Sequence, residues 1–321
     1  MVAVPVLDVR DLSVEFRTRS GVVRAVESVS FSVAKGEMIG VVGESGSGKS
    51  VTAYALMGIL EAAGRVTGGS AMFGGADLLK ASESELQELR GRELSMIFQN
   101  PRVALNPIRR VGLQIADVLL RHGNVTRAQA PARAIDMLKA VRIPDPERRA
   151  RAYPFELSGG MCQRIMIAIA LACAPSLLIA DEPTTGLDVT TQAAIMDLIS
   201  ELARERGMAT VLITHDLGMA AEYCDRIVVM HAGHVVENAP TAELFASPRH
   251  PYTAKLIAAT PRPESRLDDL VAIGGNLPDL RSASLPPCRF SGRCDRAEPD
   301  CAQPLPRRVA GGSMVACWNP L

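Results

Sequence analysis

Residues 43–50 read GESGSGKS and match the spacing G-x-x-x-x-G-K-[ST] of a phosphate-binding loop. Glycines let backbone N–H groups converge on phosphate oxygens, the lysine neutralises charge on the β- and γ-phosphates, and the last hydroxyl binds Mg²⁺. The pattern therefore predicts a site for ATP. Its candidate residues are Gly43, Glu44, Ser45, Gly46, Ser47, Gly48, Lys49, Ser50 and Val51.

The sequence on either side of this loop favours the same interpretation. Residues 37–42 are a short apolar run, as expected for a buried strand, and residues 51–60 predict a helix. Strand, glycine loop and helix is the setting that the motif requires. It places phosphates at a helix N-terminus, where unpaired N–H groups favour an anion.

A second set of candidates lies where predicted parallel strands end. Residues 177–181 are an apolar run ending in Asp181, which can hold Mg²⁺ directly or through water. Glu182 can polarise the attacking water, although a carboxylate after a strand can also be an ordinary surface residue. The predicted strand at 209–214 ends at His215, and ligands of such sheets bind at these strand ends.

Ser158, Gly159 and Gly160 precede a predicted helix at residues 161–174. Free N–H groups and a hydroxyl at a helix start offer a second anion site. One chain with two such sites suggests that two subunits enclose ATP between them. The alternative is a helix cap with no phosphate contact.

The remaining pattern predicts one large ATP-binding domain, residues 1–260, and an extension, residues 261–321. Antiparallel strands are expected beside the core, and residues of about 100–175 should form a helical insertion. The expected elements are strands at 7–16 and 22–33, helices at 111–121, 129–141 and 189–206, and a hairpin at 226–238.

The composition of the chain limits the kinds of binding partner that we expect. The 321 residues are 47% hydrophobic with a formal net charge of zero, which gives no indication of nucleic acid binding. The longest apolar stretch, residues 165–180, is broken at Pro175 and is too short to cross a bilayer. Residues 1–5 lack the features of a signal peptide. We therefore expect a cytoplasmic protein, with any membrane association made through a partner.

The extension contains four of the seven cysteines, spaced C-x5-C-x6-C-x15-C. A small proline-rich segment needs a staple, and in the cytoplasm clustered thiols favour a metal over disulfides. Zinc sites usually contain a C-x2–4-C pair, which is absent, and a [4Fe–4S] cluster fits equally. These residues are Cys288, Cys294, Cys301 and Cys317; Cys162, Cys173 and Cys224 are interpreted as small buried hydrophobic residues.

Five further motifs, in order, resemble those of an ABC-type ATPase: FQNP at 98–101, LSGGM at 157–161, DEPT at 181–184, GLD at 186–188 and THD at 214–216. The resemblance covers about residues 7–240. It implies an α/β P-loop NTPase (RecA-like) core with an antiparallel β-subdomain and an α-helical signature subdomain. The Cys/Pro-rich C-terminal extension follows.

The resemblance also implies roles for single residues. Gln99 matches the residue that touches Mg²⁺, with Ser50 and Asp181, and reports to the membrane partner. Ser158, Gly159 and Gly160 match the signature that caps ATP held by the opposite subunit. Further matches are Glu182 (catalytic carboxylate), His215 (switch histidine), Asp188 (D-loop) and Phe16 (adenine stacking), although a phenylalanine on an apolar strand is more often core.

Finer features are similar to the ATP-binding subunits of dipeptide, oligopeptide and nickel importers. They are ALNP at 104–107, LDVTTQ at 187–192, Met161 and RHPYT at 249–253. Cys162 and Gly186 depart from that group, which usually has arginine and alanine there. We expect both departures to be neutral, although Cys162 leaves the signature helix one positive charge short.

This narrower resemblance implies an energy-coupling subunit on the cytoplasmic face of the cell (inner) membrane, bound peripherally. Its partners would be a second ATPase subunit, either a paralogue or a copy of itself, two membrane permeases and, indirectly, an extracytoplasmic binding protein. It also implies a [4Fe–4S] cluster at the extension's cysteines, with zinc as the alternative. A competing hypothesis is a soluble ABC-type ATPase acting on DNA or ribosomes, but tandem cassettes and basic tracts are absent.

Overall fold

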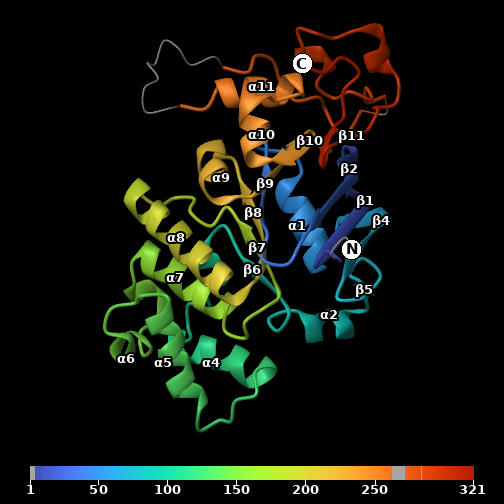
Figure 1. Ribbon diagram of the computed structural model, residues 1–321. Helices are drawn as coiled ribbons and strands as arrows, with labels where there is room; N and C mark the ends of the chain where they lie inside the picture. Colours follow the sequence, from blue (N-terminus) through green and yellow to red (C-terminus); the bar gives the residue numbers. More distant parts are fainter. Residues whose placement is uncertain (1–3, 262–271, 283) are drawn as a thin grey trace. The chain divides into compact units, whose positions relative to one another are not determined.

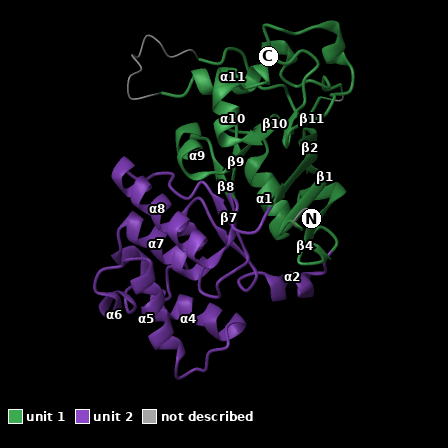
Figure 2. Ribbon diagram, viewed as in Figure 1, with its two compact units in different colours: residues 1–33, 38–80, 212–321 green, residues 34–37, 81–211 purple. Residues whose placement is uncertain are grey.

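The computed structural model describes residues 4–261, 272–282 and 284–321 (Figure 1). The chain divides into two compact units, each described here by itself (Figure 2). The first contains residues up to 33, residues 38–80 and residues from 212 onward, and the second contains residues 34–37 and 81–211. Strand β8 (Ala209–Thr214) begins in the second unit and ends in the first.

An antiparallel sheet forms one part of the first unit. Its strand order is β2-β1-β4-β5, with register running from Leu7 opposite Val33 to Thr18 opposite Gly21. The expected antiparallel pair is thus confirmed, whereas the last two strands were not predicted because glycines interrupt their pattern. The strands are β1 (Leu7–Thr18), β2 (Gly21–Val33), β4 (Gly64–Phe73) and β5 (Ala76–Asp77).

A second run of strands in the first unit has the order β11-β12-β10-β9-β3. Strand β3 (Met38–Val42) pairs in parallel with β9 (Arg226–His231) and is buried throughout, as its continuous apolar sequence requires. The expected hairpin of β9 and β10 (His234–Pro240) is confirmed.

The chain beyond residue 260 contributes to this unit. Strand β12 (Ser313–Val315) pairs with β10 and with β11 (Arg308–Ala310), and neither of these short strands was predicted. The domain boundary near residue 260 stays a prediction. Among the described residues, the helices of the first unit are α1 (Lys49–Met57), α9 (Leu217–Tyr223), α10 (Thr241–Ala246), α11 (Pro251–Ala258) and the 3₁₀ turns η3 (Ser291–Arg293) and η4 (Pro299–Ala302).

The second unit has a buried pair of parallel strands, β6 (Leu94–Ile97) and β7 (Leu177–Asp181). In the sequence, helices precede, separate and follow these two strands. The helices expected at 111–121, 129–141 and 189–206 are confirmed. Helix α7 ends four residues earlier than predicted, in a turn that leads to Pro175. The helices are α2 (Glu83–Leu89), α3 (Pro101–Ala104), α4 (Val111–His122), α5 (Ala130–Ala140), α6 (Pro146–Arg149), η1 (Pro154–Glu156), α7 (Gly159–Ala170) and α8 (Val189–Arg206).

A search of the residues described finds no helix long and apolar enough to cross a membrane.

Candidate functional site

The phosphate loop connects the end of β3 to the start of α1, as the sequence predicts. Two of its glycines occupy positions that no side chain could share. A Cβ at Gly43 would lie 2.1 Å from the Met230 carbonyl oxygen, and one at Gly48 would lie 2.7 Å from that of Ala25. Both residues also have positive φ angles, of 152° and 99°. The loop therefore has its shape because glycine stands at these positions.

Lys49 is buried at the start of α1, and the loop curls around its ammonium group. Its Nζ donates hydrogen bonds to the carbonyl oxygens of Gly43 at 2.8 Å and Glu44 at 3.0 Å, and lies 3.4 Å from Ser47 Oγ. An ammonium group held at the centre of a ring of backbone groups can neutralise a bound phosphate without first being ordered.

Glu44 is held by contacts that sequence reasoning missed. Its backbone N–H donates to the Tyr252 hydroxyl at 3.0 Å, and its carboxylate accepts two hydrogen bonds of 2.9 Å from Arg293. Burial raises the pKa of the Tyr252 hydroxyl well above its usual range. Tyr252 lies within a segment that carries the resemblance to importers, but no sequence signal connects residues 208 and 249 positions apart.

In the second unit, the predicted catalytic carboxylate contacts the predicted Gln99. The Glu182 Oε2 atom accepts a hydrogen bond from Gln99 Nε2 at 2.7 Å and another from Thr185 Oγ1 at 2.9 Å. Glu182 also has a left-handed backbone, with φ of 46°, which costs energy for a residue other than glycine. Asp181, one residue earlier, ends β7 and is only 1% exposed.

The predicted signature caps helix α7. The Ser158 hydroxyl accepts a hydrogen bond from the Met161 N–H at 3.3 Å, and Gly159 and Gly160 form the first turn. Asp188 caps α8 in the same way, accepting from the Thr191 N–H and hydroxyl, which lower the pKa of its carboxyl.

A cavity of about 430 Å³ connects these parts of the second unit. Its lining residues are Gln99, Asn100, Pro101, Arg102, Gly159, Gln163, Thr185, Gly186 and Leu187. The segment after Gln99, the signature and the D-loop therefore face one space.

The other predicted residues are described in the first unit. Phe16 is half-buried, and its ring lies against Gly64, where a Cβ would approach it to 2.8 Å. His215 is exposed after β8, and Ser50 is half-buried in α1. The roles of all these residues stay predictions.

All seven cysteines are free. Cys162 is buried, and its thiol donates to the Pro154 carbonyl oxygen at 3.4 Å. Cys224 is also buried, and desolvation raises its pKa to about 12. The interpretation of these two as buried small residues is confirmed, whereas Cys173 is partly exposed.

The four cysteines of the extension are close enough to affect one another. Burial, reinforced by Cys301, Cys317 and Cys294, raises the pKa of Cys288 to about 11. Within the described residues, however, no group of three or more His, Cys, Asp or Glu side chains is arranged to hold a metal ion. Four thiols are the right kind and number of ligands for a soft metal. Their side chains, however, do not converge on a single metal position.

Comparison with known proteins assigns the chain. A sequence model described as ABC transporter matches residues 26–185, and one described as oligopeptide/dipeptide transporter, C-terminal region, matches residues 236–301. The ATP-binding cassette MJ0796, solved as a dimer bound to ADP and Pi after hydrolysis, superposes with a TM-score of 0.66 at 26% identity, covering 73% of this chain and 98% of that one. The described fold and these matches define an ATP-binding protein of the ABC transporter class.

Full-length relatives narrow this class. The chain is 48% identical to the oligopeptide transport ATP-binding protein OppD of Escherichia coli (strain K12), over 98% of this chain and 93% of the relative. It is 49% identical to a probable peptide ABC transporter ATP-binding protein, y4tR, of Sinorhizobium fredii, covering 98% and 94%. The chain belongs to the ATP-binding subunits of the oligopeptide/dipeptide family of ABC transporters, and its activity is ATP hydrolysis coupled to transport.

Proposed function

We propose that this chain hydrolyses ATP to drive import of peptides, or of nickel or a related small solute, through two membrane permeases. It would act at the cytoplasmic face of the cell membrane, beside a second ATPase subunit that is a paralogue or another copy, with cargo delivered by an extracytoplasmic binding protein. The phosphate loop carries this proposal, because Lys49 is already ordered at its centre. The match of residues 236–301 to the C-terminal region of oligopeptide/dipeptide transporters supports peptides as the cargo class.

In the proposed reaction, the loop backbone and Lys49 bind the phosphates, and Phe16 stacks on adenine. Glu182 accepts a proton from the attacking water, and the Gln99 amide orients that carboxylate. His215 contacts the γ-phosphate, and Asp188 belongs to the interface with the second subunit. Positioning and charge stabilisation are what phosphoryl transfer mainly requires of a protein.

The proposed ligands of Mg²⁺ are Ser50, Gln99 and Asp181, and they offer oxygen atoms of the kind that this ion prefers. When bound, Mg²⁺ would neutralise charge on the phosphates. Asp181 is buried at the end of β7, and a bound cation would offset the cost of burying its charge.

The second half of the ATP site would come from another subunit. Ser158, Gly159 and Gly160 begin a helix of 12 residues, and such a start favours an anion. We propose that they cap the γ-phosphate bound to the loop of the partner. The MJ0796 cassette was solved as a dimer, which supports this arrangement for a related fold.

We further propose that residues 261–321 form a Cys/Pro-rich extension in which Cys288, Cys294, Cys301 and Cys317 bind a [4Fe–4S] cluster, with zinc as the alternative. The four free thiols supply the number and kind of donor that such a group requires, which supports the donor set. The group would stabilise the extension, and no step of ATP hydrolysis passes through it. Iron and acid-labile sulfide assays on protein purified without oxygen test the cluster.

Uptake of a labelled oligopeptide by cells tests the proposed function. A strain lacking this gene should regain uptake with the wild-type chain but not with Glu182→Gln. Uptake by the deletion strain at the wild-type rate, or rescue by the Glu182→Gln variant, would contradict the proposal.

A further inference from the structure

The C-terminal extension reaches the phosphate loop through Arg293. The two terminal nitrogens of this arginine each bond one carboxylate oxygen of Glu44 at 2.9 Å, and its side chain is only 6% exposed. Such a two-point pairing of guanidinium and carboxylate fixes orientation as well as distance. Glu44 directly follows Gly43, so the contact acts on the loop itself.

Contacts within the extension hold this arginine in place. Arg293 Nε donates to the Gly274 carbonyl oxygen at 2.9 Å, and the guanidinium lies 5.8 Å from the centre of the Phe290 ring. Phe290 packs edge-on against Tyr252, with ring centres 5.3 Å apart, and Tyr252 accepts the Glu44 N–H. The side chain and the backbone of Glu44 are therefore anchored to one packed cluster.

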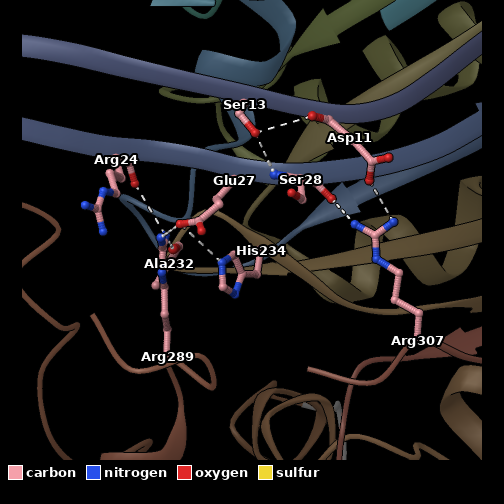
Figure 3. A network of polar contacts seen from close by, with 9 residues as sticks. All are labelled: Asp11, Ser13, Arg24, Glu27, Ser28, Ala232, His234, Arg289 and Arg307. Atoms are coloured by element: carbon pink, nitrogen blue, oxygen red, sulfur yellow. Dashed lines mark hydrogen bonds and ion pairs between the residues drawn. The ribbon is translucent and has the colours of Figure 1, made fainter. Parts of the chain in front are cut away.

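A second arginine of the extension supports the other end of the loop indirectly. Arg289 is buried and donates to the Ala232 carbonyl oxygen and to the Glu27 carboxylate (Figure 3). The next residue, Gly233, donates its N–H to the Ser47 carbonyl oxygen at 2.9 Å. The β9–β10 turn thus connects Arg289 to the loop.

Charge gives Arg293 a specific consequence for nucleotide binding. The Glu44 carboxylate lies in a loop that must receive a polyanion, and an unpaired carboxylate there would repel phosphate. Arg293 neutralises it and holds it away from solvent, at 25% exposure. Without the arginine, the loop would lose an anchor and gain a repulsive charge.

We propose that Arg293 is a positioning residue for ATP binding, which makes the C-terminal extension part of the nucleotide site. This inference rests on the proposed function of the loop and goes beyond it, because the sequence analysis gives Arg293 no role in nucleotide binding. Arg293 would not contact the nucleotide. It would act by pairing Glu44 and fixing the loop around Lys49.

Equilibrium binding of a fluorescent ATP analogue with Mg²⁺ to the full chain tests this proposal. Arg293→Ala should weaken binding about tenfold, the order expected for a lost charge-assisted pair. Arg293→Lys keeps the positive charge but cannot make the two-point pairing with the carboxylate, so it should give a smaller loss of affinity. The matched control is Arg296→Ala, because Arg296 also lies in the extension but bonds Asn319 and Pro320.

The double variant Glu44→Ala/Arg293→Ala separates positioning from general damage. Removing the unpaired carboxylate should recover part of the affinity lost in Arg293→Ala, and added salt should reduce the deficit of the single variant by screening the repulsion. Thermal melting of each variant shows whether it is folded. Wild-type affinity in Arg293→Ala, or a double variant as weak as the single one and a deficit that ignores salt, would overturn the proposal. Failure of the wild-type chain to bind the analogue would instead contradict the proposed function.

Discussion

The phosphate loop of the first unit and the carboxylate site of the second are held by different kinds of contact. Gly43 and Gly48 fix the loop through backbone shape, and Lys49 and Glu44 are bonded from several sides. Glu182 instead lies on a left-handed backbone, and its carboxylate accepts side-chain hydrogen bonds from Gln99 and Thr185. The comparison indicates that backbone shape positions the phosphate loop, whereas side-chain hydrogen bonds orient the proposed catalytic carboxylate.

Glu182→Gln in the second unit should have the largest effect, which is on turnover. Turnover should fall about a thousandfold, the scale of a lost general base, while ATP affinity stays unchanged. Measurement of phosphate release by the chain with its membrane partners checks this. Glu205→Gln, which changes an exposed carboxylate on α8 of the same unit, is the control. Normal turnover by the Glu182 variant would remove this residue from the mechanism.

Lys49→Ala in the first unit should have the next largest effect, which is on ATP affinity. Loss of the ammonium removes both a phosphate partner and the bonds to the Gly43 and Glu44 carbonyl oxygens, so ATP affinity should fall roughly a hundredfold. Titration with the fluorescent ATP analogue measures it. Lys35→Ala, at an exposed turn, should bind as the wild type does. Equal affinities for the two variants would show that Lys49 does not hold phosphate.

Gln99→Ala in the second unit should have a moderate effect on turnover. Glu182 would lose its amide donor and keep the Thr185 hydroxyl, so turnover should fall about tenfold. Loss of one proposed Mg²⁺ ligand should lower ATP affinity by less than this. Adding the same change to Glu182→Gln should cause no further loss, because both act through one carboxylate. An additive loss of turnover would contradict the assigned contact.

The smallest effect concerns the acid stability of two buried histidines that pack on the cluster of Tyr252 and Phe290: the His231 ring lies 4.5 Å from that of Tyr252, and the His250 ring lies 6.0 Å from that of Phe290. Burial lowers the pKa of His231 to about 4 and that of His250 to about 3, from an ordinary 6.5. The folded protein therefore binds fewer protons than the unfolded chain below about pH 6.5, and the free energy of unfolding falls as pH falls toward the folded-state values. His231→Phe removes one such group and should flatten this decline by at most about 1.4 kcal/mol per pH unit. Denaturant unfolding at several pH values checks it, and parallel curves for the variant and the wild type would contradict it.

Local patterns predicted much of the fold and of the candidate site. Continuous apolar runs identified β3, β7 and β8, and helical spacing identified α8 with its bounds. The phosphate loop was predictable because its glycines, lysine and hydroxyl are adjacent in sequence.

The contacts of the extension were not predictable in the same way. Arg293 and Glu44 are 249 positions apart, and an arginine beside a cysteine has no periodicity to mark it. Strands β11 and β12 are each three residues long; β12 pairs with β10, and β11 pairs with β12. Features that arise from pairing between distant segments require the folded chain.

The dependence of turnover on ATP concentration, measured for Arg293→Ala and Gln99→Ala with the membrane partners present, tests the division between the two regions most directly. We expect Arg293→Ala to raise KM about tenfold at nearly constant kcat, and Gln99→Ala to act mainly by lowering kcat. If both variants change the same parameter, binding and turnover are not assigned to separate regions of this molecule.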